Sequence, residues 1–181
     1  GTIYRYLKKQ KHQISEARRI PEINHYFPFL TSLGMDTMLL LLPSDIAPYT
    51  RVVLANRSRF LDNMNNKDLW HVSMNEAVTA TDCHDGKVDL KLCLERGMRE
   101  ELGINTKIHL LQQPKYLRLF LVIKDFEIGI LNSVKLDMDF NLLKECHKHS
   151  KDGALETSGR GLTAVRYSDK ALQEFVDQND M

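Results

Sequence analysis

The rest of this chain is organised around Glu95–Ile104, which reads Glu-Arg-Gly-Met-Arg-Glu-Glu-Leu-Gly-Ile. In and before this stretch, apolar residues recur at roughly helical spacing, and they are Val88, Leu90, Leu94, Met98 and Leu102. We therefore predict an amphipathic helix over residues 89–102. Asp89 is suited to cap its start, and Gly103 stands where a helix stop favours a left-handed residue. Because residues three and four apart are neighbours on a helix, positions 97, 100 and 101 share one face.

The composition is that of a soluble globular protein. The 181 residues suffice for one well-cored domain, with 43% hydrophobic and 27% charged residues. The net charge of +1 argues against a nucleic-acid or membrane partner. Cys83, Cys93 and Cys146 form no Cys-x-x-Cys pair, which gives neither a disulfide framework nor a zinc site and favours a reducing compartment such as the cytoplasm. No apolar run approaches the ~20 residues that span a bilayer.

We expect two parts, a helical extension over residues 1–34 and a domain over residues 35–181. The extension has an excess of basic residues, which is typical of an arm for nucleic acid or membrane, or of a solvated helix that packs its apolar side on the domain or a partner domain. We favour the packed helix, because basic and aromatic residues do not interleave. The chain begins with Gly1, so the sequence leaves open an attached domain before it, and it also leaves open a homodimer.

Apolar alternation and turn residues predict the remaining elements. Strands are expected at 35–42, 51–56, 69–78, 106–111, 116–124, 127–134 and 162–167. Helices are expected at 140–149 and at the end of the chain, where Asp169 would cap a helix that runs through residue 176. Residues 116–123 are apolar nearly throughout, which suits a central strand covered on both faces. The order of elements predicts an α/β fold, an α/β/α sandwich with a mixed, largely antiparallel central sheet.

Residues 96–104 resemble the second half of the Nudix box, whose consensus is Gly, five residues, Glu, seven residues, Arg-Glu-aliphatic-any-Glu-Glu-any-Gly-aliphatic. The residues on this pattern are Arg96, Met98, Glu100, Glu101, Gly103 and Ile104, whereas Gly97 replaces the first Glu of the helix. In the first half, the consensus Glu falls on Val88 and the consensus Gly on Asp82, because residues 79–88 form a longer polar loop. The resemblance covers roughly residues 35–178 and implies the Nudix fold.

The resemblance implies a hydrolase of a nucleoside diphosphate linked to another group, which uses Mg²⁺ or Mn²⁺ to activate water. It places Glu100 and Glu101 at metal-ligand positions and Arg96 where it orients these carboxylates. Because Gly97 removes one carboxylate, we expect Glu76, at the end of the preceding strand, to replace it. The further site candidates are Glu156, in the late loop, as a metal ligand and Arg57 and Arg59 as holders of a substrate phosphate.

Two functions remain open, and both involve a nucleotide-type small molecule. The first is the metal-dependent hydrolase, which Arg96, Glu100, Glu101 and Glu76 favour. The second is a catalytically impaired Nudix-fold module that binds a nucleotide or a protein and regulates an attached domain, which Gly97 favours. Paired Glu is also common on solvated helix faces, but two acids in the last turn oppose the helix dipole, which favours a functional reason for them. We lean to the hydrolase.

Overall fold

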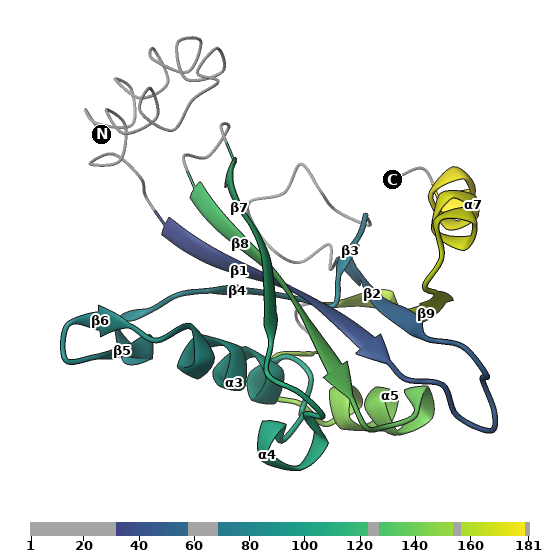
Figure 1. The fold of residues 1–181 in the computed structure, drawn as a ribbon, viewed down its shortest axis with the longest axis horizontal. Helices are drawn as coiled ribbons and strands as arrows, with labels where there is room; N and C mark the ends of the chain where they lie inside the picture. Colours follow the sequence, from purple (N-terminus) through teal and green to yellow (C-terminus); the bar gives the residue numbers. More distant parts are fainter. Residues whose placement is uncertain (1–31, 58–68, 123–126, 154–156, 180–181) are drawn as a thin grey trace, which may run out of the picture.

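The computed structural model describes residues 32–57, 69–122, 127–153 and 157–179 (Figure 1). A seven-stranded mixed sheet forms its centre, with the order β3-β2-β1-β8-β7, while β4 pairs with β1 and β9 pairs with β2. The strands are β1 (Ser32–Leu41), β2 (Arg51–Arg57), β3 (Trp70–Val72), β4 (Met74–Ala77), β7 (Lys115–Val122), β8 (Glu127–Leu136) and β9 (Thr157–Arg166). β1 and β8 run parallel, and the other pairs in this sheet run antiparallel.

Helices cover both sides of the sheet in the described part of the chain. They are α3 (Leu90–Glu100), α4 (Thr106–His109), α5 (Phe140–Lys148) and α7 (Asp169–Asn179), and none of them is long and apolar enough to cross a membrane. Figure 1 shows α3, α4 and α5 on one side, where Leu94 of α3 and Leu143 of α5 belong to the same buried hydrophobic cluster as Leu39 of the sheet. On the other side α7 lies near β2 and β9, and its Phe175 meets Trp70 edge to face, with ring centroids 5.3 Å apart. The predicted α/β/α sandwich with a mixed, largely antiparallel sheet is confirmed.

The predicted central helix and both of its ends are confirmed. The Asp89 carboxylate accepts the N–H groups of Lys91 at 2.9 Å and Leu92 at 3.4 Å, which satisfies two amides at the start of α3. Gly103 has φ +67°, and a Cβ atom there would collide with the carbonyl oxygen of Cys146. This position therefore needs glycine both for its backbone conformation and for its close contact with the end of α5.

The predicted strand over 69–78 is two strands, because Ser73 breaks it. β3 pairs with β2, whereas β4 pairs with β1. Ser73 is 2% exposed, and its hydroxyl donates to the carbonyl of Val53 at 2.6 Å and accepts the N–H of Leu39 at 3.0 Å. The side chain thus supplies the hydrogen bonds that the backbone ladder lacks where β1 and β2 diverge.

Three predictions about later elements were wrong: the strand at 106–111, the central position of the strand at 116–124, and Asp169 as the cap of the last helix. Residues 106–109 form helix α4 instead of a strand, because the Asn105 side chain accepts the N–H of Lys107 at 3.1 Å and so starts a helical turn. The strand predicted at 116–124 exists as β7, but it lies at the edge of the sheet and its Leu119 is 68% exposed. The last strand is longer than expected, because β9 starts at Thr157. Asp169 lies in the first turn of α7, and Ser168 caps it by accepting the N–H of Ala171 at 3.4 Å.

An insertion separates β4 from α3, where the sequence predicts a long polar loop. It consists of the 3-10 helix η2 (Ala80–Asp82) and a small hairpin of β5 (Cys83–His84) and β6 (Lys87–Val88). The turn of this hairpin places both Asp85 and Gly86 at positive φ. The insertion brings η2 against the side of α3, which positions the candidate site.

Candidate functional site

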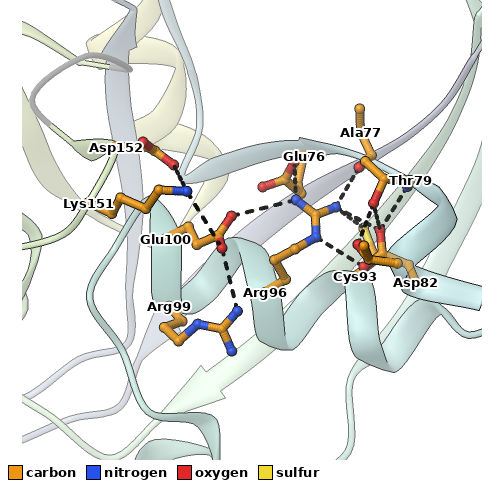
Figure 2. A network of polar contacts seen from close by, with 11 residues as sticks. Glu76, Ala77, Thr79, Asp82, Cys93, Arg96, Arg99, Glu100, Lys151 and Asp152 are labelled. Atoms are coloured by element: carbon orange, nitrogen blue, oxygen red, sulfur yellow. Dashed lines mark hydrogen bonds and ion pairs between the residues drawn. The ribbon is translucent and has the colours of Figure 1, made fainter.

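Arg96 extends from α3 into a group of carboxylates (Figure 2). Its Nε and Nη2 atoms donate to the two oxygens of Asp82, at 3.0 and 2.7 Å, in a bidentate pair. Nη2 also donates to the carbonyl of Ala77 at 2.7 Å. The remaining nitrogen, Nη1, lies 2.9 Å from Glu76 and 3.8 Å from Glu100. One guanidinium therefore joins the end of β4, the inserted η2 and the helix α3.

Asp82 holds Arg96 in place and is a site residue that the resemblance to the Nudix box does not predict. Its carboxylate is 2% exposed and also accepts the N–H of Thr79 at 2.8 Å and the Thr79 hydroxyl at 3.1 Å. The hydrogen bonds from Arg96, followed by those from Thr79, lower the pKa of Asp82 to about 2 against the cost of burial. The spacing Thr79-x-x-Asp82 is that of a capping box, which is the signal in the sequence that points to this residue.

Glu76 lies next to Gly97, the position at which this chain lacks the glutamate of the Nudix pattern. A Cβ atom added to Gly97 would lie 3.1 Å from the Cβ atom of Glu76 and 2.6 Å from the sulfur of Met74. The side chain of Glu76 is 16% exposed, and burial raises its pKa, against the lowering effect of Arg96 and with a further rise from the charge of Glu100. A carboxylate from the neighbouring strand thus lies beside the helix at the glycine.

Glu100 is surrounded by cations. Besides Arg96, Arg99 lies 3.5 Å and Lys151 lies 3.9 Å from the Glu100 carboxylate. Lys151 also pairs with Asp152 at 3.8 Å, and the backbone N–H of Asp152 donates to the carbonyl of Glu100 at 2.9 Å (Figure 2). The side chains of Arg99 and Lys151 are 67% and 70% exposed, so these two pairs are solvated, weak and readily exchanged.

The structure brings only some of the predicted site residues together. Arg96, Glu76 and Glu100 form one network, whereas Glu101 is 7% exposed and its backbone carbonyl accepts the hydroxyl of Ser150 at 2.8 Å. Arg57 ends β2 next to His71, where burial and the Arg57 charge lower the pKa of His71 to about 4. The remaining candidates, Glu156 and Arg59, lie outside the described residues, as do residues 1–31 of the predicted extension.

A divalent cation fits this site only as part of a complex with substrate. Within residues 32–57, 69–122, 127–153 and 157–179, no group of three or more His, Cys, Asp or Glu side chains is arranged to hold a metal ion. Mg²⁺, however, is usually bound through one or two carboxylates together with substrate phosphates and water, and not by a cage of protein ligands. Glu76 and Glu100, which share the nitrogen Nη1 of Arg96, provide two such carboxylates. These two carboxylates could therefore contribute ligands to a Mg²⁺ or Mn²⁺ ion only if phosphate and water oxygens supplied the rest of its coordination.

Comparisons with known proteins find similarity in solved structures only. No protein-family model and no curated protein sequence matches the chain. The Nudix domain of NrtR from Shewanella oneidensis, solved with ADP-ribose, aligns at 12% identity and a TM-score of 0.47 over 87% of this chain and 96% of that one. The Ap4A hydrolase of C. elegans aligns at 8% identity and a TM-score of 0.46, over 83% of this chain and 88% of that one.

A MutT/nudix family protein from Enterococcus faecalis aligns at 12% identity and a TM-score of 0.45, over 88% of this chain. The alignment spans 55% of that protein, or about half of its length. Identities and scores in this range concern the course of the backbone and carry no information about activity.

Proposed function

We propose that this domain is a Nudix-type hydrolase, which cleaves the pyrophosphate of a nucleoside diphosphate linked to another group with the help of Mg²⁺ or Mn²⁺. The observation that carries the proposal is the convergence of Glu76 and Glu100 on Nη1 of Arg96, beside Gly97. Glu76 replaces the carboxylate that the helix lacks. When bound, the metal would neutralise the phosphate oxygens and lower the pKa of the attacking water.

The residues of the chain have separate tasks in this proposal. Arg96 orients Glu76 and Glu100, and it keeps its own position because Asp82 binds its other two nitrogens. Lys151 and Arg99, whose pairs with Glu100 are solvated, would bind the substrate phosphates if Glu100 held a cation. We further assign Glu101 and Glu156 to metal binding, and Arg57 and Arg59 to the substrate.

A second candidate is the impaired module that binds a nucleotide without turning it over. Two observations favour it. Met74 fills the space beside Gly97, and both Glu76 and Glu100 already have cationic partners within the protein. A site that is neutralised internally has less need of a divalent cation. Turnover distinguishes the two candidates.

The test measures release of phosphate or nucleoside monophosphate from nucleotide sugars, dinucleoside polyphosphates, ADP-ribose and nucleoside triphosphates, with Mg²⁺ or Mn²⁺. We expect Glu76→Gln and Glu100→Gln to reduce metal-dependent turnover by roughly 10²–10³-fold, as expected for a lost electrostatic contribution to catalysis. Glu95→Gln is the matched control, because Glu95 lies on the same helix and pairs with Lys91 at 3.8 Å. Nucleotide binding with no turnover by any of these proteins would support the module, and full turnover by Glu76→Gln would refute the assignment of Glu76.

A further inference from the structure

The Ser150 hydroxyl joins the C-terminal ends of two helices. It lies 2.8 Å from the carbonyl oxygen of Glu101, just after α3, and 2.7 Å from that of His147, in the last turn of α5, so one O–H group donates to both. It also accepts the N–H of Gly153 at 3.0 Å. The last carbonyls of a helix lack partners within the helix and carry partial negative charge. Ser150 therefore satisfies both helix ends at the point where their like partial charges meet.

The contact between the two helix ends leaves no spare room. A Cβ atom added to Gly103, after α3, would collide with the carbonyl oxygen of Cys146 in α5. A Cβ atom added to Gly153 would collide with the Ser150 hydroxyl and with the same two carbonyl oxygens that this hydroxyl binds. Because close-packed atoms transmit a displacement to their neighbours, a change at either Ser150 or Gly153 must shift the backbone between them.

This backbone carries Lys151 to the candidate site. Lys151 stands between Ser150 and Asp152, and the N–H of Asp152 donates to the carbonyl of Glu100 at 2.9 Å. The Lys151 ammonium lies 3.9 Å from the Glu100 carboxylate and 3.8 Å from that of Asp152 (Figure 2). The side chain of Lys151 is 70% exposed, but the residues on both sides of it are bound to the end of α3. The position of this ammonium beside Glu100 therefore depends on the fixed backbone of segment 150–153.

We propose that Ser150 is a positioning residue of the site: its hydroxyl fixes segment 150–153 on the end of α3 and so holds the Lys151 ammonium beside Glu100, where it competes with a divalent cation. The proposal rests on the proposed function, because it takes Glu100 as a metal ligand. The solvated pair of Lys151 and Glu100 is weak, so a doubly charged ion can displace the ammonium. A hydroxyl group outside the coordination of the metal thus helps to set the affinity for it.

The test measures the affinity of the full chain for Mn²⁺ by electron paramagnetic resonance, without nucleotide. We expect Ser150→Ala to raise this affinity about two- to fivefold, the range expected for the loss of a solvated ion pair. The double variant Ser150→Ala/Lys151→Ala should bind Mn²⁺ no more tightly than Lys151→Ala alone, because Ser150 acts through Lys151. Ser168→Ala is the matched control, since the Ser168 hydroxyl accepts the N–H of Ala171 at 3.4 Å at the start of α7, and it should leave the affinity unchanged.

An affinity that Ser150→Ala leaves unchanged or lowers, or effects of the two substitutions that add, would overturn the proposal. Should Ser150→Ala fail to fold, Gly153→Ala takes its place, because its methyl group displaces the same hydroxyl.

A measurement without metal separates this proposal from the proposed function. We expect the amide hydrogen of Asp152 to exchange several-fold faster in Ser150→Ala than in the unmodified chain, because the segment then opens more often. Unchanged exchange would overturn the role of Ser150 even if Mn²⁺ binds. Absence of Mn²⁺ binding in every variant would instead refute the metal site, and with it the competition at Glu100.

Discussion

Replacing Asp82 with asparagine should be among the most destabilising conservative changes in this domain. The carboxylate is buried and takes part in four hydrogen bonds, two from Arg96 and two from Thr79. The fall of its pKa from 3.8 to about 2 corresponds to about 2 kcal/mol of stability at neutral pH. The new amide would also point N–H groups at a guanidinium that has only donors, which costs about a further 1–2 kcal/mol. We therefore expect a loss of about 3–4 kcal/mol in the free energy of unfolding.

Urea unfolding followed by fluorescence measures this loss, because Trp70 is the single tryptophan of the chain and packs on Phe175. Asp85→Asn is the matched control: its side chain is 86% exposed, and asparagine tolerates its positive φ of 50°. The control should change stability by less than about 0.5 kcal/mol. An equally small change in Asp82→Asn would refute the reasoning, since the bidentate pair would then contribute nothing.

The acid side of the stability curve gives an independent check on Asp82. A carboxylate whose pKa is lowered by folding stabilises the protein above its unfolded pKa, and this contribution is lost as pH falls towards the folded pKa. For Asp82 this stability is lost as the pH falls from about 3.8 to about 2. The unmodified protein should therefore lose about 2 kcal/mol more than Asp82→Asn across this interval. Parallel curves for the two proteins would contradict the assignment.

Two further predictions concern the neighbours of the site. Gly97→Ala should destabilise the domain by about 1 kcal/mol, because overpacking against Met74 costs about 1–3 kcal/mol and alanine regains about 1 kcal/mol of helix propensity. A urea midpoint at or above that of the unmodified protein would contradict the close contact between residue 97 and Met74. Lys151→Ala should change the free energy of unfolding by less than about 0.5 kcal/mol but raise the affinity for Mn²⁺, measured by electron paramagnetic resonance, because Glu100 loses a competing cation. The control Lys170→Ala, at an 87% exposed lysine on α7, should leave the affinity for Mn²⁺ unchanged.

Local signals in the sequence predicted the elements that depend on local chemistry. Helix α3 was predictable because its apolar period, its cap Asp89 and its stop Gly103 all indicate the same boundaries. The failures arise from contacts between distant residues. Nothing local in the sequence indicates that Ser73 bonds to Leu39 and Val53, or that the apolar strand β7 ends the order of the described strands.

The site was predictable where it follows the helix and not where it depends on the insertion. Arg96 and Glu100 are one turn apart, so their proximity follows from helical geometry alone. The position of Glu76 at the end of a predicted strand places it near the helix, and in the structure its carboxylate lies 2.9 Å from Arg96. Asp82 was missed because the family pattern assigns its position to a glycine, and because its partner is 14 residues further along the chain.

The role of Asp82 changes how the resemblance to the Nudix box is interpreted. The resemblance assigns Arg96 the task of orienting the helical carboxylates, which by itself would leave the arginine dependent on them. Here Nε and Nη2 are bound by Asp82 and Ala77, and only Nη1 faces Glu76 and Glu100. We therefore expect Arg96 to keep its position in Glu76→Gln and in Glu100→Gln. The insertion that spoils the first half of the sequence pattern thus supplies a fixed support for the second half.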